Sequence, residues 1–198
     1  MRILLIGATG TIGSAIAAEL GARHDVILAS REKSAEKVDI ADPDSVRALF
    51  SRVGHLDAVV SAAGRAVFKP LADLTDEDFA ISLRSKLMGQ VNLYRIGLDS
   101  VKDGGSFTLT AGYFARTPIP GSAAGSLVNA ALEGFGRAAA LEAPRGIRVN
   151  IVSPGWVAET LVKVGRSPDT GIPAAKLATY YARCVEGAET GVTVDPVP

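Results

Sequence analysis

The chain has 198 residues, with 21 Lys plus Arg, 21 Asp plus Glu and a formal net charge of zero at pH 7. This balance offers no basic surface for nucleic acid or for an anionic membrane, and the length fits a single domain. Cys184 is the single cysteine, which excludes an internal disulfide, and the two histidines are too few for a metal cluster. We therefore expect no metal site.

The apolar run before Gly7 is too short for the core of a signal peptide, and no run approaches the roughly 20 apolar residues that span a bilayer. We therefore expect a cytoplasmic protein without a membrane partner.

Short apolar runs alternate along the chain with longer segments of helical period, which is typical of βαβ units and a parallel sheet. Helices are expected at Thr11–Leu20, from Asp42-Pro43-Asp44 onward, at 82–98, over the apolar stripe 124–139, and near Pro173. The pattern predicts an α/β fold in which residues 1–198 form one domain, a doubly wound parallel sheet of about seven strands with helices on both faces. The expected strands are Ile3–Ile6, Val26–Ala29, Val38–Ile40, Leu56–Ser61, Phe107–Thr110, Ile147–Val152 and Val192–Val194.

The sequence GATGTIG, with Gly7, Gly10 and Gly13, lies directly between the first expected strand and the first expected helix. Glycines there let the backbone turn tightly, approach a pyrophosphate and pack the helix close to the strand. The phosphates would then meet the positive N-terminus of the helix at Thr11–Gly13. The motif predicts a dinucleotide-binding Rossmann fold, with a purely structural turn as the alternative.

The second expected strand ends in VILASR, where an NAD-binding protein would carry an acid for the ribose 2′-OH. Ser30 and Arg31 cannot accept that pair of hydrogen bonds, whereas a hydroxyl and a guanidinium suit a 2′-phosphate. We therefore expect NADP(H) to be favoured over NAD(H), unless Arg31 is simply a solvated surface residue.

At this point the chain resembles the short-chain dehydrogenase/reductase family (SDR) over essentially its whole length. The resemblance rests on GATGTIG, on the Asp39-Ile40 pair, on Ser61-Ala62-Ala63-Gly64 in place of Asn-Asn-Ala-Gly, on GIRVNIVSPGWV at 146–157, and on the final motif at 190–195. The GxxGxxG spacing is closer to the extended or atypical branches of the family than to its main branch.

The resemblance implies a nicotinamide cofactor over the carboxyl ends of the strands, and a homodimer or homotetramer built on the two long central helices. Carried over position by position, the implied cofactor residues are Gly7, Thr9, Gly10, Thr11, Ile12, Gly13, Ser30, Arg31, Asp39, Ile40, Ala62, Ala63, Gly64, Pro154, Gly155 and Val157.

The family's four catalytic positions are all changed in this chain. Alignment puts its Tyr at Gly125 and its Lys at Asn129, so the phenol and the cation that lowers its pKa are both absent. The family Ser falls at Ala111 or Gly112, and the family Asn falls at Lys86. The chain therefore resembles a divergent sub-branch of the family that lacks the usual active-site residues.

Three residues are candidates to replace the missing groups. Lys86 stands where the family Asn lies, Tyr113 follows the strand end that normally carries the Ser, and Thr110 closes that strand. A desolvated Lys beside a phenol can rebuild a proton donor. The competing interpretation makes Lys86 a structural or ribose-binding cation, Tyr113 a packing residue and Thr110 a structural strand end.

Three functions remain open at this stage. The first is an NADP(H)-dependent oxidoreductase that acts on an unknown small-molecule carbonyl or alcohol through a non-standard site. The second is an NADP(H)-binding sensor or scaffold without turnover, favoured by the simultaneous loss of four catalytic positions. The third, a structural subunit in a hetero-oligomer with active relatives, has no surface feature to support it.

Overall fold

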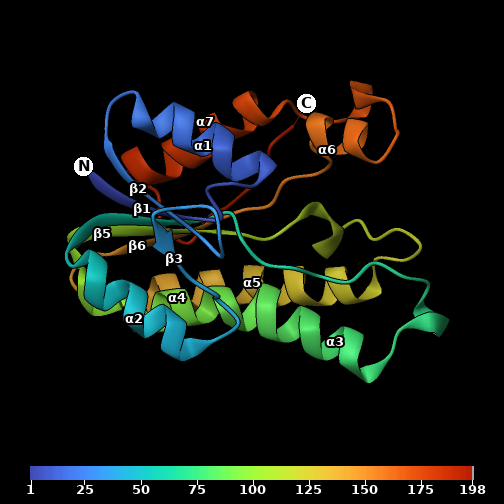
Figure 1. Cartoon of the computed structure of the whole chain (residues 1–198), viewed down its shortest axis with the longest axis horizontal. Coiled ribbons are helices and arrows are strands. Elements are labelled where there is room, and N and C mark those ends of the chain that lie inside the picture. The colour runs from blue at the N-terminus through green and yellow to red at the C-terminus, as the bar shows by residue number, and fades with distance from the viewer. Residues whose placement is uncertain (198) are drawn as a thin grey trace.

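The computed structural model describes residues 1–197 and shows one seven-stranded sheet in the order β3-β2-β1-β4-β5-β6-β7, with every neighbouring pair parallel. This confirms the predicted α/β class and the doubly wound topology (Figure 1). Because the strands are parallel, all their carboxyl ends lie at one edge of the sheet. The strands are β1 (Arg2–Ile6), β2 (Asp25–Ser30), β3 (Glu36–Lys37), β4 (Leu56–Ser61), β5 (Val101–Thr110), β6 (Arg148–Val152) and β7 (Thr193–Val194).

Helices cover both faces of this sheet. In Figure 1, α1 (Thr11–Gly21), α6 (Ala158–Lys163) and α7 (Ala174–Glu186) lie on one side. The other side carries α2 (Pro43–Val53), α3 (Asp76–Ser82), α4 (Gly89–Gly97) and α5 (Ala123–Glu142).

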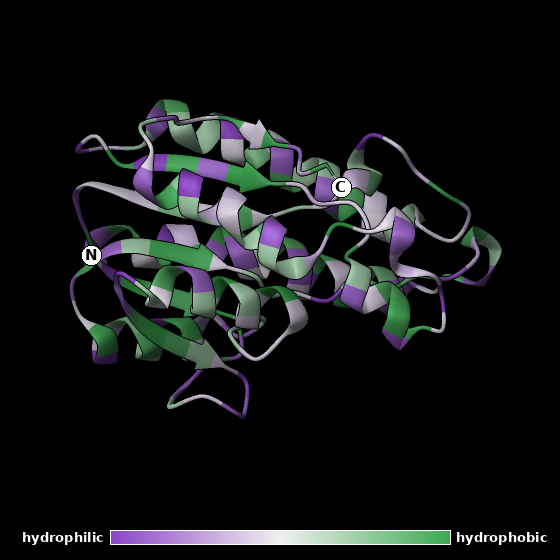
Figure 2. Cartoon of the chain, turned by 90° about the horizontal axis from the view of Figure 1, so that it is seen from above, coloured by the Kyte–Doolittle hydropathy of each residue, from purple (hydrophilic) through white to green (hydrophobic). Residues whose placement is uncertain are grey.

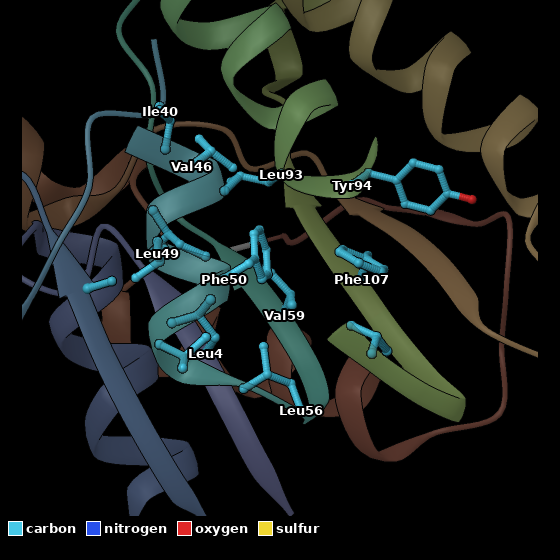
Figure 3. Packing of buried hydrophobic residues seen from close by; sticks show 14 of the residues in the cluster. Leu4, Ile40, Val46, Leu49, Phe50, Leu56, Val59, Leu93, Tyr94 and Phe107 are labelled. Atoms are coloured by element: carbon cyan, nitrogen blue, oxygen red, sulfur yellow. The ribbon is translucent and has the colours of Figure 1, made fainter. Parts of the chain in front are cut away.

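Two apolar layers hold the helices to the sheet, one on each face. Alternate residues of β1 supply both layers, since Leu4 packs toward α2 and α4 while Leu5 packs toward α1 and α7. In Figure 3, Leu49 and Phe50 of α2 meet the strand residues around Leu4. Figure 2 shows mostly hydrophobic strands beside helices of mixed hydropathy, as expected for a sheet buried on both faces.

The third strand lies earlier than predicted. The sequence places it at Val38–Ile40, whereas β3 spans Glu36–Lys37. The Val38 amide still donates to the Ser30 carbonyl at 3.0 Å, but the Asp39 amide donates to the Ser45 hydroxyl instead of to a strand. The chain therefore turns toward α2 while Val38 and Ile40 remain buried, which is what made the segment read as a strand.

The helix predicted at 82–98 starts earlier and changes its winding. Thr75 and Asp78 form a reciprocal capping box that starts α3 at Asp76. The run continues as η2, a π-helical stretch over Leu83–Met88, before α4 begins. Leu83, the first residue of this stretch, is 37% exposed.

Strand β5 spans Val101–Thr110 and is longer than the predicted Phe107–Thr110. Its first half was not predicted because it is polar and rich in glycine, and such residues are depleted in strands. Its pairing with β4 shifts register between Leu56 and Ala58.

Cys184 of α7 is buried, and this burial raises the pKa of its thiol to about 11. Among residues 1–197, no helix is long and apolar enough to cross a membrane.

Two leucines of α5 test the packing against the sheet. Leu132 is fully buried, whereas Leu141 is 89% exposed. We expect Leu132→Ala to lower the free energy of unfolding by about 2–5 kcal/mol, because it leaves a cavity, and Leu141→Ala to change it by less than about 0.5 kcal/mol. Urea denaturation of both variants measures this, and equal losses would contradict the placement of Leu132.

Candidate cofactor and active site

The glycine loop joins β1 to α1 through backbone contacts that leave no room for side chains. Gly7 has a φ of +85°, and a Cβ there would lie 2.6 Å from the Ala62 carbonyl oxygen. A Cβ on Gly13 would lie 2.0 Å from the Gly7 carbonyl oxygen. The first turn of α1 is thereby held directly beyond the end of β1.

A cavity of about 440 Å³ opens above this loop. Its walls come from the ends of β1, β2 and β4 and from the segment after β3, which the parallel topology brings together. The predicted cofactor residues that line it are Gly7, Thr9, Gly10, Ser30, Arg31, Asp39, Ile40, Ala62, Ala63 and Gly64.

Charged side chains of both signs line the end of the cavity at β2, where Arg31 and Lys33 lie near Glu32 and Asp39. The Arg31 guanidinium lies 3.7 Å from the Asp39 carboxylate, and both side chains are largely exposed. Lys33, which the sequence analysis missed, also lines the cavity, and its backbone amide donates to the Ser30 hydroxyl at 3.0 Å. The arrangement fits a phosphate group, since Arg31 and Lys33 supply positive charge beside a hydroxyl.

The N-terminus of α1 has no side-chain cap, because its N-cap is Gly10. Its first amides are therefore available to an anion. Predicted residues Thr11, Ile12 and Gly13 form this turn without lining the cavity, and Ile12 packs into the core. Lys163 of α6 donates to the Thr11 hydroxyl at 2.6 Å, which brings a further cation to the same turn.

Lys86 lies against the loop that follows β4. Gly64 has a φ of +115°, and a Cβ there would lie 3.0 Å from both Cα and Cδ of Lys86. Burial lowers the pKa of the Lys86 ammonium to about 8. Within residues 1–197 its Nζ has no acidic partner within ion-pair distance.

Tyr113 and Pro154 lie side by side at the carboxyl ends of β5 and β6. The Tyr113 amide donates to the Pro154 carbonyl at 2.9 Å, and Tyr113 is exposed. Val157 is buried and bridges to Ile172, while a Cβ on Gly155 would meet open space. Predicted residues Pro154, Gly155 and Val157 therefore form a separate wall that does not line the 440 Å³ cavity.

The buried carboxylate of Glu133 contacts the residue that directly precedes this wall. Glu133 of α5 accepts a hydrogen bond of 2.8 Å from the Ser153 hydroxyl and lies 3.3 Å from the Arg116 guanidinium. Arg116 also pairs with Asp195. The network connects α5 with Ser153, which follows β6, and with Asp195, which follows β7.

The face of α5 that carries the family's Tyr and Lys is filled differently here. A Cβ on Gly125 would lie 2.9 Å from the Phe68 ring, so a ring from the loop after β4 occupies the space beside the helix. Asn129 is only 5% exposed, and its Oδ1 has no hydrogen-bond partner among the described residues. This amide lies beside the Gly112 backbone.

The Thr110 hydroxyl is occupied within the protein. It donates to the Ser61 carbonyl at 2.5 Å and lies 2.8 Å from the Tyr181 hydroxyl, and Thr110 is buried. These contacts join β4, β5 and α7 below the site.

Sequence reasoning missed Phe68, Glu133 and Lys163 because their contacts join residues that are far apart in the sequence, and it also missed Lys33. For Lys33 a signal was present, since it lies two residues after Arg31 in the loop that follows the second strand. In the part of the chain that the structure describes, no cluster of three or more His, Cys, Asp or Glu side chains is arranged to hold a metal.

Comparison with solved structures agrees with this architecture. The protein lin1944 from Listeria innocua superposes with a TM-score of 0.95 at 44% identity, over 98% of each chain. A small-chain dehydrogenase in complex with NADPH superposes with a TM-score of 0.88 at 26% identity, over 100% of this chain and 96% of that one.

Curated proteins and family models give the same grouping. The hydroxynaphthalene reductase-like protein Arp2 of Metarhizium brunneum is 33% identical over 78% of this chain and 67% of its own length. Versicolorin reductase stcU of Emericella nidulans is 31% identical over 78% of this chain and 68% of its own length. The family model described as enoyl-(acyl carrier protein) reductase matches residues 8–194. With this match, the relatives and the fold in agreement, the chain belongs to the short-chain dehydrogenase/reductase family of oxidoreductases.

Proposed function

We propose that the protein is an NADP(H)-dependent oxidoreductase that reduces the carbonyl group of a small molecule, with Lys86 in place of the family's Tyr and Lys. The observation that carries this proposal is the Lys86 ammonium, which is partly buried against Gly64 and whose pKa burial lowers to about 8. General acids work best when their pKa lies near the working pH.

The cavity supports binding of a nicotinamide dinucleotide. The glycine backbone and the uncapped first turn of α1 suit the pyrophosphate, and Lys163 adds a cation there. Ser30, Arg31 and Lys33 suit a 2′-phosphate, which favours NADP(H) over NAD(H). The similar NADPH-bound dehydrogenase supports the same assignment.

The reaction divides between cofactor and protein. When bound, reduced nicotinamide supplies the hydride to the carbonyl carbon. The Lys86 ammonium holds a proton at Nζ and delivers it to the carbonyl oxygen, and solvent then restores that proton. Tyr113, at the strand end beside Pro154, orients the carbonyl oxygen through its hydroxyl. Two relatives that are named as reductases support this direction of the reaction.

We also propose a homo-oligomer that forms through the outer face of α4 and α5. Leu127 of α5 and Met88, the last residue of η2 before α4, are exposed, and a Cβ on Gly134 would meet open space, so that α5 offers a surface that a second helix can approach closely.

The NADP(H) preference is tested by Arg31→Ala. Losing a charge-assisted hydrogen bond of about 1.5–3 kcal/mol should raise the Kd for NADPH on the order of tenfold or more and change the Kd for NADH by less than about twofold. Fluorescence titration with both cofactors measures this. Arg47→Ala, at an exposed pair with Asp44 on α2, is the control. Equal effects of Arg31→Ala on the two cofactors would remove the 2′-phosphate assignment.

The role of Lys163 is tested by Lys163→Ala. If this cation faces the pyrophosphate, the variant should weaken NADPH and NADH binding alike, by about tenfold, because both cofactors carry that group. An unchanged Kd for both would leave the Thr11 contact as a purely structural one.

The role of Lys86 is tested by the pH dependence of carbonyl reduction. Because burial lowers the pKa of Lys86 to about 8, the protonated donor is present below pH 8, and kcat should fall as the pH rises through that value. Lys86→Met should abolish NADPH oxidation with a panel of carbonyl substrates while NADPH still binds.

The exposed Lys176 of α7 provides the matched control, Lys176→Met, which should keep full activity.

The free energy of unfolding gives a second measurement of the charge on Lys86. A buried Lys with a lowered pKa costs stability while it is charged, so Lys86→Met should stabilise the fold most below pH 8. NADPH binding without turnover in the wild-type protein would instead favour the sensor function.

A further inference from the structure

A second cavity, of about 650 Å³, is lined in part by Phe68, whose ring lies beside Gly125. It is lined mainly by apolar side chains of two loops, together with Trp156, which follows Gly155, and Arg166. Its volume is in the range of sites that bind small organic ligands. The loop residues that form it include Phe68, Leu71, Ile119 and Pro120.

Two aromatic rings of this cavity, Phe68 and Trp156, are connected through the ring of Phe114. The ring centres of Phe68 and Phe114 are 5.7 Å apart with an interplanar angle of 67°, and those of Phe114 and Trp156 are 5.6 Å apart at 76°. Such edge-to-face contacts fix ring orientation. Because the Phe68 ring also packs over Gly125, this row of three rings begins where the family carries its Tyr and ends next to Gly155.

Of the two cations that line this cavity, Lys69 has an acidic partner, and Arg166 has none among residues 1–197. Lys69 pairs with the Asp78 carboxylate at 2.8 Å and is neutralised. Arg166 lies with its guanidinium carbon 5.2 Å from the centre of the Trp156 ring, and none of the acidic side chains of residues 1–197 lies within ion-pair distance of it. The aromatic row therefore ends in an oriented guanidinium that is open to an anion.

We propose that the substrate is a flat aromatic carbonyl compound that carries a carboxylate. Its ring system lies against Phe68 and Trp156, and its carboxylate binds Arg166. This inference rests on the proposed reduction at the same site, and it names the substrate class that the site takes.

Calorimetric titrations with three probes, in the presence of saturating NADPH, test the substrate class. The probes are 6-acetyl-2-naphthoate, its neutral analogue 2-acetylnaphthalene, and decanoate, an anion without a ring. We expect 6-acetyl-2-naphthoate to bind most tightly of the three. Decanoate binding equally or more tightly would overturn the aromatic class, and failure of 6-acetyl-2-naphthoate to bind would overturn the proposal as a whole.

Two variants separate the aromatic contact from the ionic one. Arg166→Gln should weaken 6-acetyl-2-naphthoate on the order of tenfold and leave 2-acetylnaphthalene unchanged, because only the first probe has a carboxylate. Phe68→Ala should weaken both aromatic probes. Phe68 is 52% exposed and Arg166 is exposed, so both variants should keep the fold. Equal loss of both probes with Arg166→Gln would overturn the anionic contact.

The control variant is Arg47→Gln on α2, which should bind all three probes as the wild type does. The same titrations without cofactor keep this proposal distinct from the proposed function. Failure of NADPH itself to bind would overturn the proposed function, whereas probe binding to the cofactor-free protein that depends on Arg166 would still support the substrate pocket.

Discussion

The site depends on one steric constraint, the contact of the Gly13 backbone with the Gly7 backbone. With no side chain between them, α1 starts directly beyond β1, and its uncapped first turn faces the edge where the parallel strands end. The segments after β2 and β4 then meet the same turn and close the cavity around it. A bulkier residue at either position would push α1 away and separate the anion-binding amides from the other walls.

Two of the changed catalytic positions, Gly125 and Lys86, pack closely against the segment that follows β4. Gly125 has no side chain, and the Phe68 ring from another loop occupies the space beside it, so the two residues form one steric unit. Lys86 similarly packs over Gly64, whose positive φ brings the loop close to η2. A ring and a cation are thus present near the site, but both come from elements other than α5.

Short apolar runs predicted the seven strands, because a strand that is buried on both faces is apolar along its whole length. The predicted and observed bounds of an element differ where tertiary contacts outweigh the local sequence pattern. Val38 and Ile40 are apolar and buried but lie beyond β3, and the π-helical turn at Leu83–Met88 has no signature in the periodicity. At the site, the glycine loop was visible in sequence, whereas the approach of Phe68 to Gly125 and of Lys163 to Thr11 depends on how distant segments fold together.

The enclosed thiol of Cys184 has a practical consequence for spectroscopy. Cys184 is the single cysteine of the chain, it is buried in α7, and its pKa of about 11 keeps it protonated at neutral pH. Thiol reagents attack the thiolate and need access to it, so the native protein should resist maleimide labelling. A cysteine engineered at one exposed position would then be the sole reactive thiol, and it could carry a dye or spin label on any chosen loop without removal of the native residue.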